Sequence, residues 1–99
     1  MGWASHHISK LQDGKTVKFR PRGHSMKGRI ESGELCTVAP LTEIPEAGDV
    51  VLCKVLGKEY LHLIKSAKGD RFQIGNNTGR INGWVGLNSI FGKLIKVES

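Results

Sequence analysis

Two apolar runs with a short break between them constrain this chain more than any other feature. The runs cover residues 50–55 and 60–65, and Gly57-Lys58 lies between them. Short runs rich in β-branched residues predict strands, and a two-residue loop that contains glycine predicts a tight antiparallel hairpin. A chain with such a hairpin near its middle is expected to build a sheet around it.

The predicted register of this hairpin draws attention to His62. With Gly57-Lys58 as the loop, Val55 faces Tyr60 and Cys53 faces His62. His62 then shares an otherwise apolar face of the hairpin and needs a hydrogen-bonding partner. Two interpretations stay open from the hairpin alone: a core histidine bonded to the backbone or to Cys53, or an imidazole that works as a base near pH 7.

The remaining pattern predicts one mostly-β domain over residues 1–99, with a helical N-terminal arm over residues 1–15. In the arm, Ser5 is the expected cap of a short helix that places Ile8 and Leu11 on one face. Further strands are expected at residues 16–20, 35–39, 71–74 and 90–97, the last with a possible bulge at Gly92, and residues 75–83 are expected to form a loop rich in Gly and Asn.

A second feature is the segment Arg20-Pro21-Arg22-Gly23-His24-Ser25-Met26, which interrupts the early strand pattern. Proline fixes its own φ and glycine allows backbone angles closed to other residues, so the segment predicts a constrained, exposed turn. Ser25 on such a turn is a candidate nucleophile, and the N–H groups of His24 and Ser25 are the candidate oxyanion hole. A Gly-x-Ser turn is also common in β-rich proteins without any catalytic role.

Charge is concentrated in the first third of the chain. The net charge is +6, and residues 1–30 carry seven Lys or Arg side chains against the single acid Asp13. Such a patch attracts nucleic acid, acidic lipid or acidic protein. Residues 10–29 lack the basic runs and interleaved aromatic residues of a single-strand binder, so nucleic acid is a secondary candidate partner.

Other signals in the sequence are negative. No stretch is long and apolar enough for a membrane span and no signal peptide is apparent, so we expect a soluble, cytoplasmic protein. Cys36 and Cys53 each lie in an apolar run and are expected to be buried free thiols. Their spacing to the histidines fits no metal site, and we expect no metal and no cofactor.

The order of these pieces resembles the signal-peptidase and LexA-like serine peptidase superfamily. The resemblance covers roughly residues 17–97 and rests on Gly23-His24-Ser25-Met26, Gly33-Glu34-Leu35, Gly48-Asp49-Val50-Val51, Leu61-His62-Leu63-Ile64, Gly75-Asn76-Asn77 and Ile90-Phe91-Gly92-Lys93-Leu94-Ile95. It implies coiled β-sheets with a partly open barrel, and cleavage of a peptide bond after a small residue with Ser25 as nucleophile.

The resemblance also implies which residue is the general base that accepts the proton of Ser25. Members of the bacterial type have lysine there, whereas His62 occupies that position here, as in the endoplasmic-reticulum type of signal peptidase. The Gly-Asp-Asn signature of the family reads Gly75-Asn76-Asn77, and its base-orienting aspartate corresponds to Asn82, so Asn82 and Asn76 are the candidate orienting residues. An amide can orient an imidazole but cannot stabilise imidazolium with a full charge.

Three functions follow as alternatives. The first is a soluble serine endopeptidase with a Ser25–His62 dyad that cleaves a protein or peptide in trans; without an anchor or DNA-reading domain in these 99 residues, we expect a minimal, free-standing domain such as a phage or mobile element encodes. The second is an inactive relative that binds an extended segment by strand addition. The third is a small, basic nucleic-acid-binding β-barrel. A thiol enzyme using Cys53 with His62 ranks below these. The sequence does not indicate an oligomeric state.

Overall fold

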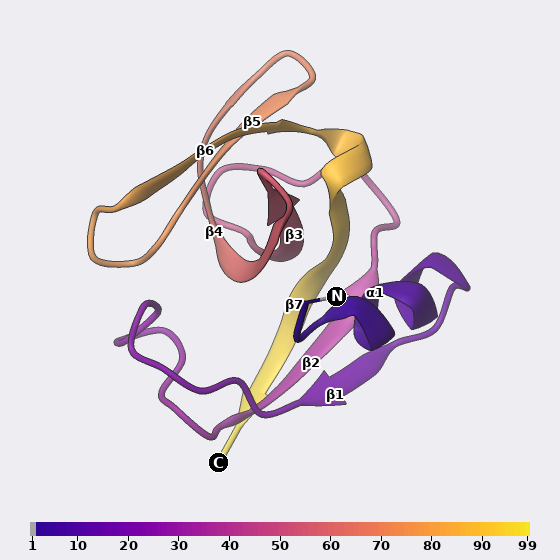
Figure 1. Ribbon diagram of the computed structural model, residues 1–99, viewed down its shortest axis with the longest axis vertical. Helices are drawn as coiled ribbons and strands as arrows, with labels where there is room; N and C mark the ends of the chain where they lie inside the picture. Colours follow the sequence, from indigo (N-terminus) through magenta and orange to yellow (C-terminus); the bar gives the residue numbers. More distant parts are fainter. Residues whose placement is uncertain (1) are drawn as a thin grey trace.

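The computed structural model describes residues 2–99, and its organising feature is one antiparallel sheet that curls on itself (Figure 1). The chain runs through α1 (Ser5–Gln12), β1 (Val17–Phe19), β2 (Leu35–Pro40), β3 (Val50–Val55), β4 (Lys58–Lys68), β5 (Arg71–Gly75), β6 (Ile81–Gly86), the short 3-10 helix η1 (Leu87–Ser89) and β7 (Ile90–Glu98).

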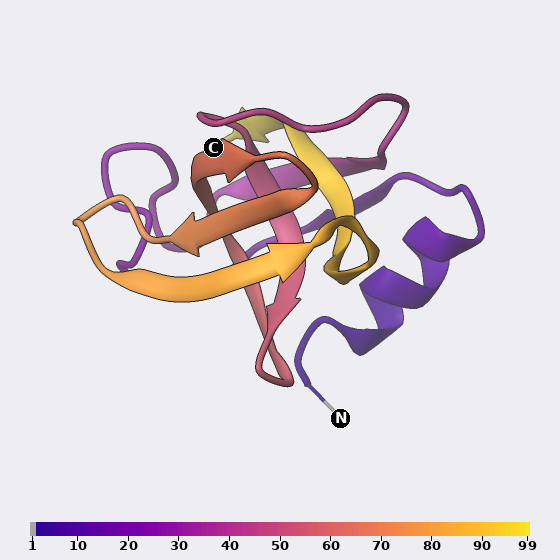
Figure 2. The same cartoon turned by 90° about the horizontal axis from the view of Figure 1, so that it is seen from above.

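The sheet has seven strands in the order β1-β2-β7-β3-β4-β5-β6, so β1 and β6 are its edges. These two edges do not pair within the described chain, and the barrel stays partly open (Figure 2). The expected mostly-β fold with a partly open barrel and one short N-terminal helix is therefore confirmed, with one continuous sheet in place of several.

Strand β3 lies at the centre of this arrangement because both of its faces are buried. Alternate residues of a strand point to opposite faces, so β3 contributes to two apolar cores. Val50 and Leu52 pack with Ile8 and Leu11 of α1, whereas Val51, Cys53 and Val55 pack under β5, β6 and the start of β7 in a second core. The short helix thus closes one side of the curled sheet and β5–β6 close the other.

The hairpin of β3 and β4 forms as predicted, but its turn is Leu56-Gly57 and not Gly57-Lys58. Val55 pairs with Lys58, and His62 pairs with Val51 instead of Cys53. Both turn residues have positive φ, 51° at Leu56 and 81° at Gly57, as a type I′ turn requires. The sequence did not predict a turn at Leu56-Gly57 because leucine rarely adopts a positive φ. The pairing moves by two residues, so His62 keeps its predicted face.

Three smaller predictions also need correction. Ala4 is the N-cap of α1 and Ser5 is its first residue, because the Ser5 hydroxyl donates to Glu59 Oε2 (2.8 Å) instead of capping the helix. Strand β6 begins at Ile81, inside the expected loop of residues 75–83, because the backbone there pairs with β5. The bulge of the last strand was expected at Gly92, but Leu52 pairs with Gly92 and Cys53 with Ile90, so Phe91 is the extra residue.

The expected burial of the two cysteines matches the structure. Cys36 and Cys53 are free and buried, and burial raises the pKa of Cys53 to about 12. In the part of the chain that is described, no helix has the length and apolar character needed to cross a membrane.

Candidate active site

Ser25 lies on an exposed turn that is held in place by two buried side chains that follow it in the chain. Met26 and Ile30 are buried, and the Ile30 N–H donates to the Met26 carbonyl (2.8 Å), which makes one helical turn directly after the serine. At the entrance, Gly23 adopts a φ of 119° and its N–H donates to Ser32 Oγ (3.2 Å). The apolar anchors hold the backbone while the Ser25 hydroxyl stays accessible.

The loop between β5 and β6 also holds the Ser25 turn in place, through hydrogen bonds to its backbone. The Asn77 N–H donates to the Ser25 carbonyl (3.0 Å), and the Asn77 side-chain amide donates to the Lys27 carbonyl (2.8 Å). Asn77 therefore bonds to the backbone on both sides of Met26. The sequence signalled a functional loop here through its Gly and Asn content, but it assigned no role to Asn77.

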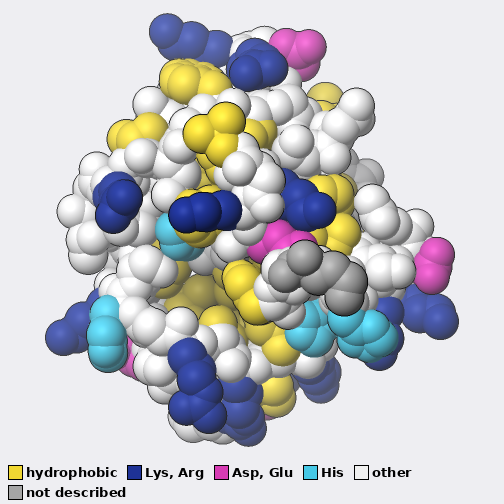
Figure 3. Space-filling view, viewed as in Figure 1, with side chains coloured by type: hydrophobic (Ala, Val, Ile, Leu, Met, Phe, Trp, Pro, Cys, Tyr) yellow, Lys and Arg dark blue, Asp and Glu magenta, His cyan; other side chains and the backbone are white. Residues whose placement is uncertain are grey.

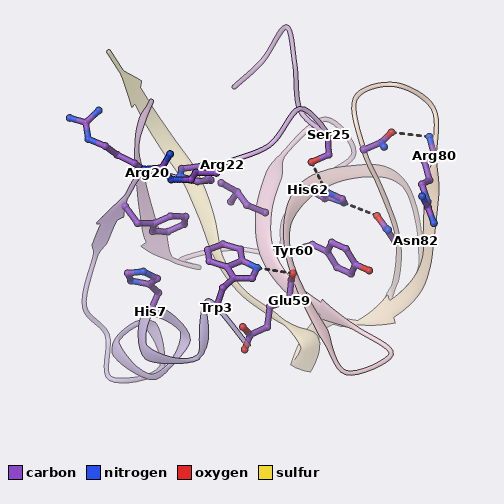
Figure 4. Close-up of a pocket in the computed structure, with 14 residues that line it drawn as sticks. Trp3, His7, Arg20, Arg22, Ser25, Glu59, Tyr60, His62, Arg80 and Asn82 are labelled. Atoms are coloured by element: carbon purple, nitrogen blue, oxygen red, sulfur yellow. Dashed lines mark hydrogen bonds between the residues drawn. The ribbon is translucent and has the colours of Figure 1, made fainter. Parts of the chain in front are cut away.

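His62 points from β4 toward Ser25, and the predicted contact between the two side chains is present. His62 Nε2 lies 3.1 Å from Ser25 Oγ, and His62 Nδ1 lies 2.7 Å from Asn82 Oδ1 (Figure 4). An amide oxygen can only accept, so Nδ1 carries the proton and neutral Nε2 is left to accept from the serine hydroxyl. Ser25, His62 and Asn82 thus form one hydrogen-bonded chain.

A β-bulge aims Asn82 at the imidazole. Ile74 pairs with Gly83 and Gly75 pairs with Ile81, so Asn82 is the extra residue of β6. A bulge bends its strand and redirects the side chain of the extra residue. This geometry brings Asn82 to His62 although β4 and β6 are separated by β5.

Asn76, the other candidate for orienting the base, does not reach His62. Its Oδ1 accepts from the Thr78 N–H (3.0 Å), the Thr78 hydroxyl (3.0 Å) and the Arg80 N–H (2.8 Å). All of these donors belong to its own loop. Asn76 therefore shapes the β5–β6 loop that carries Asn77, and Asn82 is the amide at the imidazole.

The surroundings of His62 favour its neutral form. Only 7% of the residue is exposed, and the Tyr60 ring lies 4.7 Å from the imidazole between ring centroids. Burial lowers the pKa of His62 below its ordinary value, and the hydrogen bond to Asn82 opposes this shift only in part. A neutral imidazole at pH 7 is the form that can accept a proton.

The two N–H groups proposed for an oxyanion hole are available. Among residues 2–99, the backbone N–H groups of His24 and Ser25 donate to no acceptor of the protein. These two N–H groups lie next to the Ser25 hydroxyl in the chain. The carbonyls of His24 and Ser25 accept hydrogen bonds from the N–H groups of Lys27 and Asn77, which fixes the turn. Fixed N–H donors beside a nucleophile are the groups that stabilise a developing oxyanion.

The Ser25–His62 pair opens into a groove of about 770 Å³. In Figure 3 a hollow with an apolar floor lies in the middle of this face, with Lys or Arg side chains on either side of it. Trp3 and Phe19 form part of the aromatic wall, packed edge to face with 5.5 Å between ring centroids. A second, much smaller pocket of about 40 Å³ lies beside Ser25, between Met26, Ile30 and Leu61.

Buried Glu59, which the sequence did not single out, also lines the groove. Its carboxylate accepts from the Ala4 N–H (2.6 Å) and the Ser5 hydroxyl (2.8 Å), and its carbonyl accepts from Trp3 Nε1 (3.1 Å). These bonds tie the start of α1 to β4 and hold Trp3 in the wall. No pattern in the sequence marked this contact, because the partners are more than 50 residues apart.

Cys53, the thiol that ranked below the other candidates, lies in the second core. Cys53 pairs with Tyr60, and its thiol donates to the Tyr60 carbonyl (3.6 Å) in the second core. Within residues 2–99, no group of three His, Cys, Asp or Glu side chains is arranged to hold a metal ion. Ser25 is therefore the nucleophile candidate that lies beside a base.

No family model matches the chain, and no curated protein matches it either.

Proposed function

We propose that this protein is a serine endopeptidase that cleaves a peptide or protein in trans with Ser25 as nucleophile and His62 as general base. The observation that carries the proposal is the hydrogen-bonded chain from Ser25 through His62 to Asn82 at the groove. A nucleophile within reach of a base that is itself oriented by a third group is the arrangement used for covalent acyl transfer.

In this mechanism the proton of Ser25 Oγ passes to His62 Nε2 as Oγ attacks the substrate carbonyl carbon. The negative oxygen formed there accepts hydrogen bonds from the N–H groups of His24 and Ser25. The peptide C–N bond then breaks, and the imidazolium gives its proton to the departing amine. Water attacks the resulting ester with His62 again as base, which restores Ser25 and releases the acid.

The outer edge of β4 supports an extended substrate. Val55 and Lys58, on either side of the two-residue turn, form a hydrogen-bonded pair, and such pairs recur at every second residue along the hairpin. The pair of Leu52 and Leu61 is therefore not hydrogen-bonded. The N–H and C=O of Leu61 face away from β3. β5 pairs with β4 only from Leu63 onward, so Leu61 borders the groove with a free edge. A substrate strand can add to this edge by backbone hydrogen bonds.

The smaller pocket supports a small side chain at the cleaved bond. Its volume of about 40 Å³ beside Ser25 leaves room for roughly a methyl group. The pocket is therefore matched to a side chain as small as that of alanine. This supports cleavage after a small residue.

We propose an ancestry and a compartment for the protein as well. The order of motifs that resembles the signal-peptidase and LexA-like superfamily, together with the mostly-β fold, supports membership of that superfamily in a minimal form with histidine as base. The buried free thiols Cys36 and Cys53 support a reducing compartment such as the cytoplasm.

Covalent labelling with a fluorophosphonate probe tests this proposal. We expect one labelled site, Ser25, and loss of labelling in Ser25→Ala and in His62→Gln. Ser9→Ala is the matched control, since Ser9 is exposed on α1 and does not line the groove. Cleavage of peptides with a central alanine is measured in parallel. A wild-type protein that shows neither labelling nor cleavage between pH 5 and 9 contradicts the proposal.

A second candidate function is favoured by one observation, the amide at position 82. Asn82 cannot stabilise imidazolium with a full charge, so a weak base is the expected result. A protein that binds extended segments along Leu61 without cleaving them uses the same groove. Binding of alanine-centred peptides without any labelling of Ser25 identifies this function.

A further inference from the structure

The rim of the groove is strongly cationic. Arg20, Arg22 and Arg80 line it, and Figure 4 shows Arg20 and Arg22 on one side of the Ser25–His62 pair and Arg80 on the other. These arginines come from two separate loops, so the tertiary structure is what collects them around one opening.

No carboxylate in the groove neutralises these guanidinium groups. Within residues 2–99 the salt bridges are Lys93–Asp49 and Lys96–Glu98, and neither involves the rim. Glu59 is the acidic lining residue of the groove, but it is buried and both its oxygens bond to the start of α1. Glu31 lines the smaller pocket and accepts from the Gly28 N–H (2.9 Å).

The three arginines differ in how they are held. Arg20 Nη1 donates to the Gly33 carbonyl (2.9 Å), which fixes its head group at the rim. The guanidinium groups of Arg22 and Arg80 make no hydrogen bond among residues 2–99, so their donors are available to a ligand. Guanidinium groups bind carboxylates through paired, charge-assisted hydrogen bonds.

We propose that the groove selects extended peptide segments with acidic side chains on both sides of the small residue that lies at Ser25. This inference rests on the proposed function, because it takes the occupant of the groove to be the peptide substrate. The free backbone edge at Leu61 favours a peptide over a nucleic acid, because a polynucleotide backbone has no N–H group to donate to the Leu61 carbonyl.

The test is a binding measurement on Ser25→Ala, which keeps the groove but cannot turn substrate over. Two fluorescein-labelled nine-residue peptides have a central alanine, flanked on both sides by glutamate in one and by glutamine in the other. Fluorescence anisotropy is measured at low and at physiological salt. We expect the glutamate peptide to bind about tenfold more tightly at low salt, and this preference to shrink as salt is added.

Variants then locate the preference. Arg22→Gln combined with Arg80→Gln in the Ser25→Ala background is expected to bring the two peptides within about twofold of each other. Arg71→Gln is the matched control, since Arg71 is exposed on β5 and bonds to the Trp84 carbonyl away from the groove. It is expected to keep the full preference. Thermal unfolding of each variant confirms that the fold is intact.

Three results overturn the inference: equal binding of both peptides, a preference that survives the double substitution, or tighter binding of a fluorescein-labelled single-stranded oligonucleotide of nine nucleotides. The last result assigns the cationic rim to nucleic acid. Failure here is distinct from failure of the peptidase proposal, because labelling of Ser25 in the wild type does not depend on peptide charge. Selective binding without labelling removes the enzyme and assigns the preference for acidic peptides to a protein that binds such segments without cleaving them.

Discussion

At the residue scale, the site depends on an amide where a carboxylate would be the stronger partner. Asn82 accepts from His62 Nδ1 and so sets the tautomer that leaves Nε2 free for Ser25. Burial lowers the pKa of His62, so the imidazole is neutral at pH 7 and becomes protonated only under more acidic conditions. The imidazole is therefore neutral over a wide pH range, and its proton affinity is modest.

The first prediction concerns this pairing. The labelling rate of Ser25 in the wild type is expected to fall as the pH drops through the lowered pKa of His62, with a midpoint below about 6.5. In Asn82→Asp a carboxylate favours imidazolium, so the pKa rises and the midpoint moves to higher pH. At pH 8 the labelling rate is expected to rise by about tenfold, because the stronger base accepts the serine proton more readily.

The measurement is the labelling rate between pH 5 and 9 together with an NMR titration of the His62 ring protons. Asn88→Asp is the control, since Asn88 is exposed on η1 outside the groove. An unchanged titration of His62 in Asn82→Asp would show that Asn82 does not orient the base.

At the element scale, three irregular features of a regular sheet assemble the site. The type I′ turn at Leu56-Gly57 sets which residue of β3 lies opposite His62. The bulge at Asn82 turns its side chain toward β4. The β5–β6 loop reaches the Ser25 turn through Asn77, so two connections of the sheet hold each other in place.

The second prediction tests that contact. Asn77→Ala removes the side-chain bond to the Lys27 carbonyl and is expected to cost about 1 kcal/mol of stability. Labelling of Ser25 is expected to slow severalfold, since the turn samples positions out of reach of His62. Urea denaturation and labelling kinetics measure the two effects.

Asn88→Ala serves as the control here, because its side chain makes no hydrogen bond within residues 2–99. If Asn77→Ala loses stability but is labelled at the wild-type rate, the loop supports the fold and has no part in positioning the serine.

At the scale of the whole molecule, β7 joins the two halves of the curled sheet. It pairs with β2 along one edge and with β3 along the other, and Gly92 lies where both pairings meet beneath α1. A Cβ at Gly92 would lie 2.7 Å from the Ala39 carbonyl oxygen and 2.8 Å from Val38 Cγ1. The absence of a side chain at this position lets three elements approach one another.

The third prediction follows from this close approach. Gly92→Ala is expected to destabilise the protein by about 2 kcal/mol, because the backbone of β2 must shift to relieve the overlap. Gly86→Ala is the matched control: a Cβ there meets nothing within 4 Å, and its φ is −86°. Urea denaturation of both variants measures the difference. Equal stability of the two would show that β2 and β7 separate easily at this point.

Local sequence patterns were enough to predict most of the strands, the helix and the faces that they bury. Side chains alternate with a period of two along a strand and recur about every 3.6 residues along a helix, so the burial pattern of the hairpin, the mostly-β fold and the apolar face of α1 followed from local order alone. That is why His62 kept its predicted face even though the turn was placed one residue too late. Its partners Ser25 and Asn82 followed from the resemblance of the motifs to a peptidase superfamily.

The assembly of the site depends on contacts between segments that are distant in the sequence. The contacts of His62 span 37 residues to Ser25 and 20 residues to Asn82, and no local preference specifies such distances. The bulge at Asn82, the use of Asn76 within its own loop and the clamp by Asn77 depend on how β5, β6 and the Ser25 turn meet. Hydrogen bonds of this kind are set by packing between distant segments, and the sequence pattern carries no record of them.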